Sequence, residues 1–205
     1  MNYSEVIDAV LSYSDRQDDE VISRVNLFLR MTESRINRKL ETLKMETRAR
    51  RPMELDQEYY TLPSNFLSIR SVRIVSDING AIRKTLSYVN PEQFGNLVTN
   101  QAQGDYYTII ANNFHIRTDY DPSYLIEIEF SKQIPPLSEL AESNWLSEYH
   151  PDCYIFGILT EINAFVKDAA ATSIWDVRFK ECLEEINFQD NIATWSGTAL
   201  QTRVG

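Results

Sequence analysis

Two histidines, two cysteines and a pair of glutamates are the residues of this 205-residue chain whose types and spacing could support chemistry. His150 and Cys153 are close enough in sequence to suggest a nucleophile beside its base. His150 precedes Pro151 at a predicted helix start, however, and Cys153 is predicted to face a helix bundle. Neither His150 nor His115 has a spacing that builds a metal site. We therefore expect no enzyme activity, no cofactor and no metal.

The cysteines and the paired glutamates are also expected to have no catalytic or metal-binding role. Cys153 and Cys182 are too few for a disulfide scaffold, and the first residues lack the basic and apolar regions of a secretory signal. We expect two small buried thiols rather than a disulfide or a ligand pair. Glu127 and Glu129 lie on one face of a predicted strand, where we expect a solvated face rather than the paired carboxylates of a glycosidase.

Composition excludes several further classes of protein. The net charge of −10 argues against a groove that grips nucleic acid tightly. Six glycines leave little room for a phosphate-binding loop, and no apolar run is long enough to span a membrane.

Charge is distributed unevenly along the chain. Residues 24–51 carry nine basic and three acidic residues, a net charge of +6. Residues 142–190 carry ten acidic and three basic residues, a net charge of −7. These segments are either two solvated helix faces or surfaces that attract each other, within a subunit or between neighbours.

Helical periodicity fills the N-terminal end of the chain. Residues 2–13 predict a short helix. A long second helix is expected to be capped by Asp18 or Asp19 and to continue through Leu43 toward a basic cluster before Pro52 stops it.

The C-terminal end is also predicted to be helical. One or two turns at 145–149 precede a major helix that starts at Pro151. The segment 169–173 is expected to end this helix, and Ser173 to cap the last one.

Short strands are predicted between the helical ends, from about Tyr59 to Phe130. The alternation of apolar and polar residues, together with turn signals at Asn79-Gly80 and 111–113, predicts five or six antiparallel strands. A short helix is expected to start at Pro91. An extended linker at 134–138 returns to the helical body.

These elements predict an α+β fold, in which helices from both chain ends form a bundle with an inserted antiparallel β module. The expected parts are a helical body from 1–55 and 134–195, the β module at 56–133, and a flexible tail at 196–205. Tyrosines that cluster at strand starts are interpreted as sheet packing rather than partner contacts: Tyr59, Tyr60, Tyr106 and Tyr107.

A series of motifs follows a characteristic order. The series is Tyr59-x-Thr61-Leu62-Pro63-Ser64-Asn65-Phe66-Leu67, Asn79-Gly80, Tyr106-Tyr107-Thr108-Ile109, Phe114-His115-Ile116, Glu127-Ile128-Glu129-Phe130, Ile134-Pro135-Pro136-Leu137-Ser138, Trp145-Leu146, His150-Pro151-Asp152-Cys153-Tyr154 and Trp175. This order resembles the head-to-tail adaptor, or connector, proteins of short-tailed bacteriophages and their relatives, over roughly residues 1 to 195. The charged segment Ser131-Lys132-Gln133 departs from the plain strand ending that often precedes the Pro-Leu-Ser turn, so the match is at family level.

The resemblance implies a structural virion protein rather than an enzyme. Such adaptors form a ring, commonly of twelve subunits, beneath the portal protein, where the ring extends the DNA channel and anchors tail or nozzle proteins. Genomic DNA is expected to pass through without specific binding, and no membrane is involved. The expected location is the head–tail interface of the virion, after assembly in the host cytoplasm.

Two sets of residues are candidates for these contacts. The candidate subunit interface comprises Arg24, Arg35, Arg38, Glu161, Glu184 and Glu185. The candidate portal-binding tail comprises Ser196, Thr198, Leu200, Gln201, Arg203 and Val204. The alternative function is a binding module, whose β insertion recognises a glycan or another surface protein.

Overall fold

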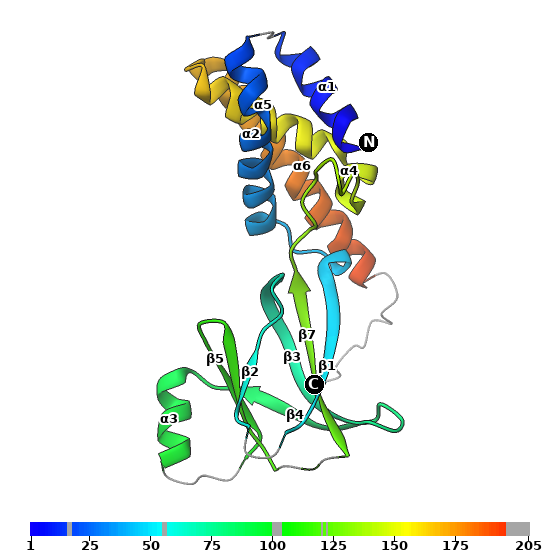
Figure 1. Ribbon diagram of the computed structural model, residues 1–205, viewed down its shortest axis with the longest axis vertical. Coiled ribbons are helices and arrows are strands. Elements are labelled where there is room, and N and C mark those ends of the chain that lie inside the picture. The colour runs from blue at the N-terminus through cyan, green and yellow to red at the C-terminus, as the bar shows by residue number, and fades with distance from the viewer. Residues whose placement is uncertain (16–17, 55–56, 100–103, 120, 122, 196–205) are drawn as a thin grey trace, which may run out of the picture. The chain divides into compact units, whose positions relative to one another are not determined.

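The computed structural model describes residues 1–15, 18–54, 57–99, 104–119, 121 and 123–195. Packing divides the chain into two compact units. The helical unit contains Met1–Lys44 and the chain from Ile134 onward, and the β unit contains Met45–Gln133 (Figure 1). The predicted α+β fold class is confirmed.

The helical unit is built around α5. Its elements are α1 (Tyr3–Ser14), α2 (Asp19–Lys39), α4 (Trp145–Tyr149), α5 (Pro151–Phe165) and α6 (Ala169–Trp195) (Figure 1). Helix α5 packs against each of the other four. Its buried side chains include Tyr154, Ile158, Leu159 and Ile162. A helix that is apolar around most of its circumference must be covered on several sides, so helices from both chain ends are needed to bury it.

The second helix is shorter than predicted. Helix α2 ends at Lys39, where Leu40 turns to an extended conformation. A short 3₁₀ turn, η1 (Leu43–Met45), follows. The backbone N–H groups of Glu41 and Leu43 donate to Asn187 Oδ1 (3.1 Å) and Asp190 Oδ2 (2.9 Å) on α6. These tertiary hydrogen bonds satisfy the backbone after the helix ends, which overrides the helical tendency of the following basic residues.

The boundary between α5 and α6 also differs from the prediction. Lys167 adopts a left-handed conformation with φ of 62° and separates the two helices. Helix α6 begins at Ala169, inside the segment expected to terminate its predecessor. Asp168, and not Ser173, caps α6 by accepting the N–H of Ala171 at 3.0 Å. Alanines favour a helix once a carboxylate satisfies its first free N–H groups.

The β unit contains one seven-stranded sheet and one helix. Its strands are β1 (Glu46–Pro52), β2 (Tyr59–Thr61), β3 (Phe66–Ser76), β4 (Ile82–Tyr88), β5 (Tyr106–Ile110), β6 (Asn113–Arg117) and β7 (Tyr124–Lys132), in the spatial order β1-β7-β3-β4-β5-β6-β2. The prediction of five or six antiparallel strands missed β1 and the parallel pairing of β4 with β5. Parallel neighbours require a crossover, and α3 (Pro91–Thr99) lies in that connection.

Both predicted hairpins are present. Gly80 has a φ of +66° in the turn that joins β3 to β4. The turn at 111–113 joins β5 to β6, with Ala111 at a φ of 53°. Gly80 takes the positive φ that its turn signal predicted, whereas Asn79 does not, and in the second turn the positive φ falls on Ala111 rather than on an asparagine.

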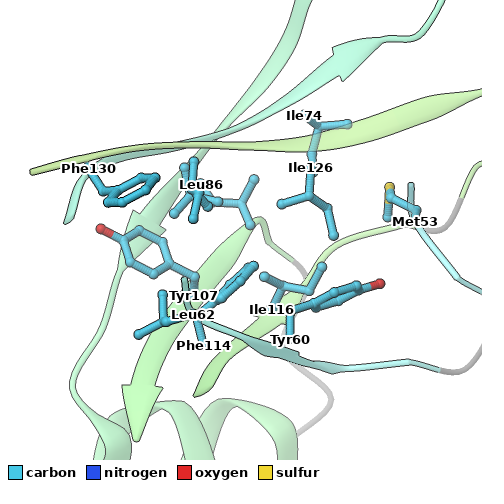
Figure 2. Close-up of a cluster of buried hydrophobic side chains, with 12 residues drawn as sticks. Met53, Tyr60, Leu62, Ile74, Leu86, Tyr107, Phe114, Ile116, Ile126 and Phe130 are labelled. Atoms are coloured by element: carbon cyan, nitrogen blue, oxygen red, sulfur yellow. The ribbon is translucent and has the colours of Figure 1, made fainter. Parts of the chain in front are cut away.

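One face of the sheet carries the apolar core of the β unit, shown in Figure 2. Alternate residues of β7 contribute to this core: Ile126, Ile128 and Phe130. Tyr60 stacks on Phe114 with ring centres 5.4 Å apart, and Tyr107 is also buried in the cluster. Sheet packing is therefore the confirmed role of these two tyrosines.

The close approach of α5 to its neighbours gives a first prediction. A methyl group at Gly157 would overlap the Cγ2 methyl of Thr32 on α2 and lie 3.0 Å from Cε2 of Phe179 on α6. We expect Gly157→Ala to destabilise the helical unit by about 1–3 kcal/mol through overpacking. Gly95→Ala in α3 is the matched control, because a methyl group there meets nothing within 4 Å.

The two variants are compared by thermal unfolding followed by circular dichroism. The control is expected to be neutral or slightly stabilising because alanine favours a helix more than glycine does. An unfolding temperature for Gly157→Ala equal to or above that of the wild type would contradict the tight packing around α5.

Candidate interaction surfaces

The cysteines and histidines, which are the residues best suited to catalysis or metal binding, have structural roles. Cys153 on α5 and Cys182 on α6 form a disulfide, with Cα atoms 5.9 Å apart. The expectation of two free thiols was therefore wrong. Helices α5 and α6 pack closely and bring together two cysteines 29 residues apart in sequence. Because Cys153 is bonded, His150 has no thiol nucleophile beside it.

The two histidines belong to different units, and each lies beside aromatic rings. His150 joins α4 to α5 beside Trp145, and burial lowers the pKa of this histidine, with Lys44 acting in the same direction against Asp152. His115 on β6 lies edge-on to Tyr59, with ring centres 4.1 Å apart, and burial also lowers its pKa. Packing accounts for both residues.

Three potential metal ligands gather among the described residues. One ligand atom from each of Asp152, Cys153 and Cys182 lies within 4.8 Å of the others. The two sulfur atoms are joined to each other, however, and so supply no thiolate ligands. The remaining carboxylate does not make a metal site by itself.

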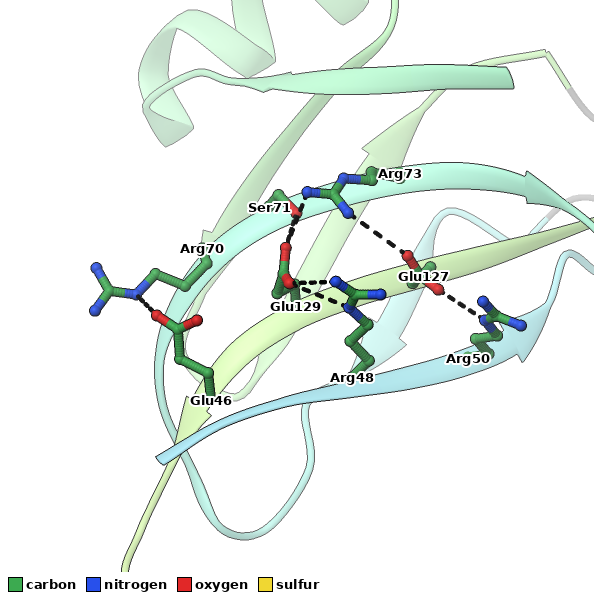
Figure 3. Close-up of polar contacts among 8 residues, drawn as sticks. All are labelled: Glu46, Arg48, Arg50, Arg70, Ser71, Arg73, Glu127 and Glu129. Carbon is green, nitrogen blue, oxygen red and sulfur yellow. Dashed lines mark hydrogen bonds and ion pairs between the residues drawn. The ribbon is translucent and has the colours of Figure 1, made fainter. Parts of the chain in front are cut away.

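Figure 3 shows a network of arginines and glutamates on the sheet. Its glutamates on β7 alternate with the core residues Ile126, Ile128 and Phe130, so the network lies on the face opposite the apolar core. Glu127, only 3% exposed, pairs with Arg50 at 2.7 Å and with Arg73 at 3.9 Å. Glu129 pairs with Arg48 at 3.0 Å and with Arg73 at 2.9 Å. The expectation of a solvated glutamate face was therefore wrong, because arginine side chains cover the carboxylates.

The strand register explains this network. Arg48 lies directly opposite Glu129, and Arg50 directly opposite Glu127, in the antiparallel β1–β7 pair. Opposite charges on directly facing residues stabilise such a pair. The signal was present in the sequence as two arginines and two glutamates, each spaced by two residues. It was missed because the basic residues before Pro52 were interpreted as the C-terminal end of the second helix.

The same contacts set the ionisation of Glu129. Burial alone would raise the pKa of this carboxyl, but hydrogen bonds from Arg48 and Ser71 and the charge of Arg73 lower it below its ordinary value. Each glutamate of this network has an arginine partner within the sheet, so removal of one partner leaves an uncompensated charge at a covered site.

Arg35 holds three helices of the helical unit together. Its guanidinium donates to Glu161 of α5 at 2.9 Å and to Asp176 of α6, and it also lies over the ring of Phe179 at 4.7 Å. Burial would lower the pKa of Arg35, but the two carboxylates raise it. The attraction predicted between the basic and acidic segments therefore occurs, at this residue, within one chain.

The other candidate interface residues are more exposed. Arg24 pairs with Glu20 of its own helix at 3.4 Å and lies over Phe165. Arg38 forms no ion pair with any described residue. It lines a hollow of about 320 Å³ between α2 and α6, together with Glu184. Glu185 is exposed on α6. The candidate tail, 196–205, lies outside the described residues.

Hydrogen bonds to Glu33 and Asn37 hold the linker 134–138 against α2, and we call these contacts the latch. The N–H of Ile134 donates to Asn37 Oδ1 at 2.9 Å, and the N–H of Leu137 donates to Glu33 Oε1 at 2.6 Å. The intervening Pro135 and Pro136 have no N–H group, so these bonds satisfy every backbone donor from 134 to 137. Glu33 and Asn37 are one helical turn apart and reach the same side of α2.

The far side of the latch is anchored by Asn144. Its side-chain amide donates to the carbonyl of Pro135 at 2.7 Å and to the hydroxyl of Tyr154 at 2.8 Å. Its Oδ1 accepts the N–H of Ser147 and thereby caps α4. The sequence predicted the extended linker, but the α2 side chains that hold it were missed because nothing in their local pattern marks them.

Comparison with known protein families gives a match over nearly the whole chain. The family model described as SU10 adaptor protein matches residues 1–203. No curated protein matches this chain. Among the described residues, none of the helices combines the length and the apolar character required to cross a membrane.

The Arg35 contacts predict a difference between two neighbouring arginines. We expect Arg35→Ala to destabilise the helical unit by about 1–3 kcal/mol, because Glu161 loses a charged hydrogen bond in a half-buried site. Arg38→Ala on the same helix is the control, with an expected effect within about 0.5 kcal/mol. Denaturant unfolding is followed by tryptophan fluorescence, since Trp145, Trp175 and Trp195 all lie in the helical unit. Equal effects of the two substitutions would contradict the internal role of Arg35.

The latch predicts a pH dependence. Burial raises the pKa of Glu33, although the Leu137 N–H and Arg30 oppose the change. Because the folded state binds this proton more tightly than the unfolded state does, protonation of Glu33 stabilises the fold. This contribution is fully present below the unfolded pKa of about 4.3 and is lost as pH rises through the raised folded pKa. Glu33→Gln keeps an acceptor for Leu137 without the charge, so we expect its stability relative to the wild type to increase from pH 5 to pH 8.

Glu33→Ala provides the contrast for this measurement. It leaves the buried N–H of Leu137 without an acceptor, and we expect a loss of about 1–3 kcal/mol at either pH. The same fluorescence-detected unfolding measures both variants. A stability difference between Glu33→Gln and the wild type that is constant with pH would exclude titration of Glu33 in this range.

Proposed function

The chain belongs to the SU10 adaptor protein family, and from this premise we propose that it is the head-to-tail adaptor of a phage virion. The observation that carries the proposal is the family match, which spans both units. An adaptor family is structural rather than catalytic, and membership implies a virion component that associates with other phage structural proteins. The packing roles of the cysteines and histidines agree with a structural protein.

The proposed assembly is a ring of subunits, commonly twelve in such adaptors, beneath the portal. It is assembled in the host cytoplasm, extends the DNA channel and anchors tail or nozzle proteins at the head–tail interface. The helical unit forms the body of the ring, and the β unit is the module that meets the tail proteins. The division of the chain into a discontinuous helical unit and a continuous β unit supports this assignment, because each unit has its own core.

Charge supports a channel that DNA passes without specific binding. The chain carries a net charge of −10, and phosphate contacts dominate protein–DNA affinity. In the β unit, arginines 48, 50 and 73 are paired with glutamates and are therefore not free to bind phosphate. An acidic channel wall repels the DNA backbone and lets it slide.

The test of this function is a structure of the protein mixed with the portal protein of the same phage. Cryo-electron microscopy is expected to show a ring of this chain stacked on the portal. Mass spectrometry of purified particles is expected to detect the chain in the virion. Absence of the chain from particles, together with absence of portal binding, would overturn the proposal.

The tail gives a more specific prediction. We propose that Ser196, Thr198, Leu200, Gln201, Arg203 and Val204 bind the portal. Deletion of residues 196–205 is expected to abolish co-sedimentation with the portal and to leave the unfolding of the helical unit unchanged. A chain with the same ten residues in scrambled order controls for length and composition. Full portal binding by the deletion variant would remove the tail from the interface.

A further inference from the structure

Helix α6 presents an apolar stripe that no described residue of the chain covers. Ile174, Val177, Phe188 and Ile192 are each more than half exposed. Their spacing places them on one side of α6, opposite the buried residues of the same helix, Phe179, Cys182, Leu183 and Ile186. Glu181 lies within this stripe, and Glu184 and Glu185 lie at its two edges. We call this surface the α6 face.

Helix α2 presents a second exposed stripe with the opposite charge. Leu27 and Met31 are about half exposed, and Arg24, Arg30 and Arg38 flank them. This side lies opposite the buried residues Val21, Val25, Phe28, Leu29, Thr32 and Ile36. Met31 and Arg38 line a hollow of about 390 Å³, and Arg38 also lines the hollow of about 320 Å³ between α2 and α6. We call this surface the α2 face.

We propose that the α6 face of one copy docks on the α2 face of a second copy. The inference rests on the proposed ring and names the surfaces that build it. The faces carry three acidic and three basic side chains respectively, and each has large apolar side chains between or beside its charges. Apolar anchors give such a contact its affinity, and the charges give it specificity.

Charge also selects against the two symmetric alternatives. A contact between two α6 faces brings glutamates together, and a contact between two α2 faces brings arginines together, so both are disfavoured. The favoured contact joins two different surfaces and leaves one of each free on the resulting dimer. Such a contact repeats from copy to copy and produces a ring when its rotation closes.

The structure also refines the interface expected from the sequence. Arg35 and Glu161 bind each other within one chain and are not free for a neighbour. Arg24, Arg38, Glu184 and Glu185 remain, and the apolar residues Leu27 and Phe188 are added as anchors. These two anchors are the positions at which the contact is most directly tested.

Two acidic substitutions disable one face each in the full-length chain. Leu27→Asp disables the α2 face and Phe188→Asp the α6 face, and both side chains are exposed, so folding is preserved. Each variant is expected to self-associate at least about tenfold more weakly than the wild type in sedimentation velocity. Ile78→Asp is the matched control, because Ile78 is 92% exposed and lies in the β unit.

An equimolar mixture of the two variants tests the direction of the contact. The intact α6 face of the Leu27→Asp chain fits the intact α2 face of the Phe188→Asp chain, and their other two faces both carry the added aspartate. The mixture is therefore expected to form dimers and nothing larger. Unchanged self-association of the single variants, or a mixture that forms larger assemblies, would overturn the inference.

A photo-crosslinker at position 188 gives a readout for the free protein and for particles. The expected product joins residue 188 of one copy to residues 24–38 of another, identified from a mixture of isotopically light and heavy chains. Products outside α2, or no product in either sample, overturn the contact. Crosslinks to α2 in a chain that neither binds the portal nor enters particles keep the contact and overturn the adaptor function. Portal binding by a chain whose crosslinks lie outside α2 would keep the adaptor function and overturn the contact.

Discussion

The need to bury α5 is the constraint on which the rest of the helical unit depends. This helix follows the β unit in sequence, but α1 and α2, which cover part of it, come before the β unit. The chain must therefore return to its beginning to complete the helical core. The intervening strands cannot share that core and form a sheet with one of their own. The insertion is thus a consequence of an apolar helix whose partners lie at both ends of the chain.

The role of each charged residue in this protein depends more on how buried its side chain is than on whether it is acidic or basic. Arg35, Glu127 and Glu129 are at most a quarter exposed and have their partners in the same unit, where loss of a charged hydrogen bond costs about 1–3 kcal/mol. Exposed pairs such as Arg24 with Glu20 contribute at most about 1 kcal/mol. Each of the covered pairs lies within one unit, and exposed charges of α2 and α6 belong to the surfaces that we propose select a neighbour.

Local sequence patterns predicted the elements whose own residues determine them. Period and turn signals located α1, α5 and both hairpins, and the motif order identified the family. The strand β1 could not be found in this way, because Glu46–Pro52 has no apolar alternation and its conformation is set by pairing with β7. The Cys153–Cys182 bond depends on how α5 and α6 align across their turn, and the linker latch on α2 side chains about a hundred residues away. The charges of the surfaces proposed for assembly were visible in the sequence. The structure was needed, however, to show that Arg35 is paired within its own chain and that Arg38 is exposed.

The spatial order of the strands leaves β1 and β2 at the two borders of the sheet. Border strands invite hydrogen bonding with the border of another sheet, and this leads to aggregation. Here one border strand carries exposed Arg48, Arg50, Arg51 and Pro52, and the other has only three residues. Charge, a missing N–H group and short length all discourage such pairing. Crowded copies of this chain are thereby protected from fibre-like stacking through the borders of their sheets.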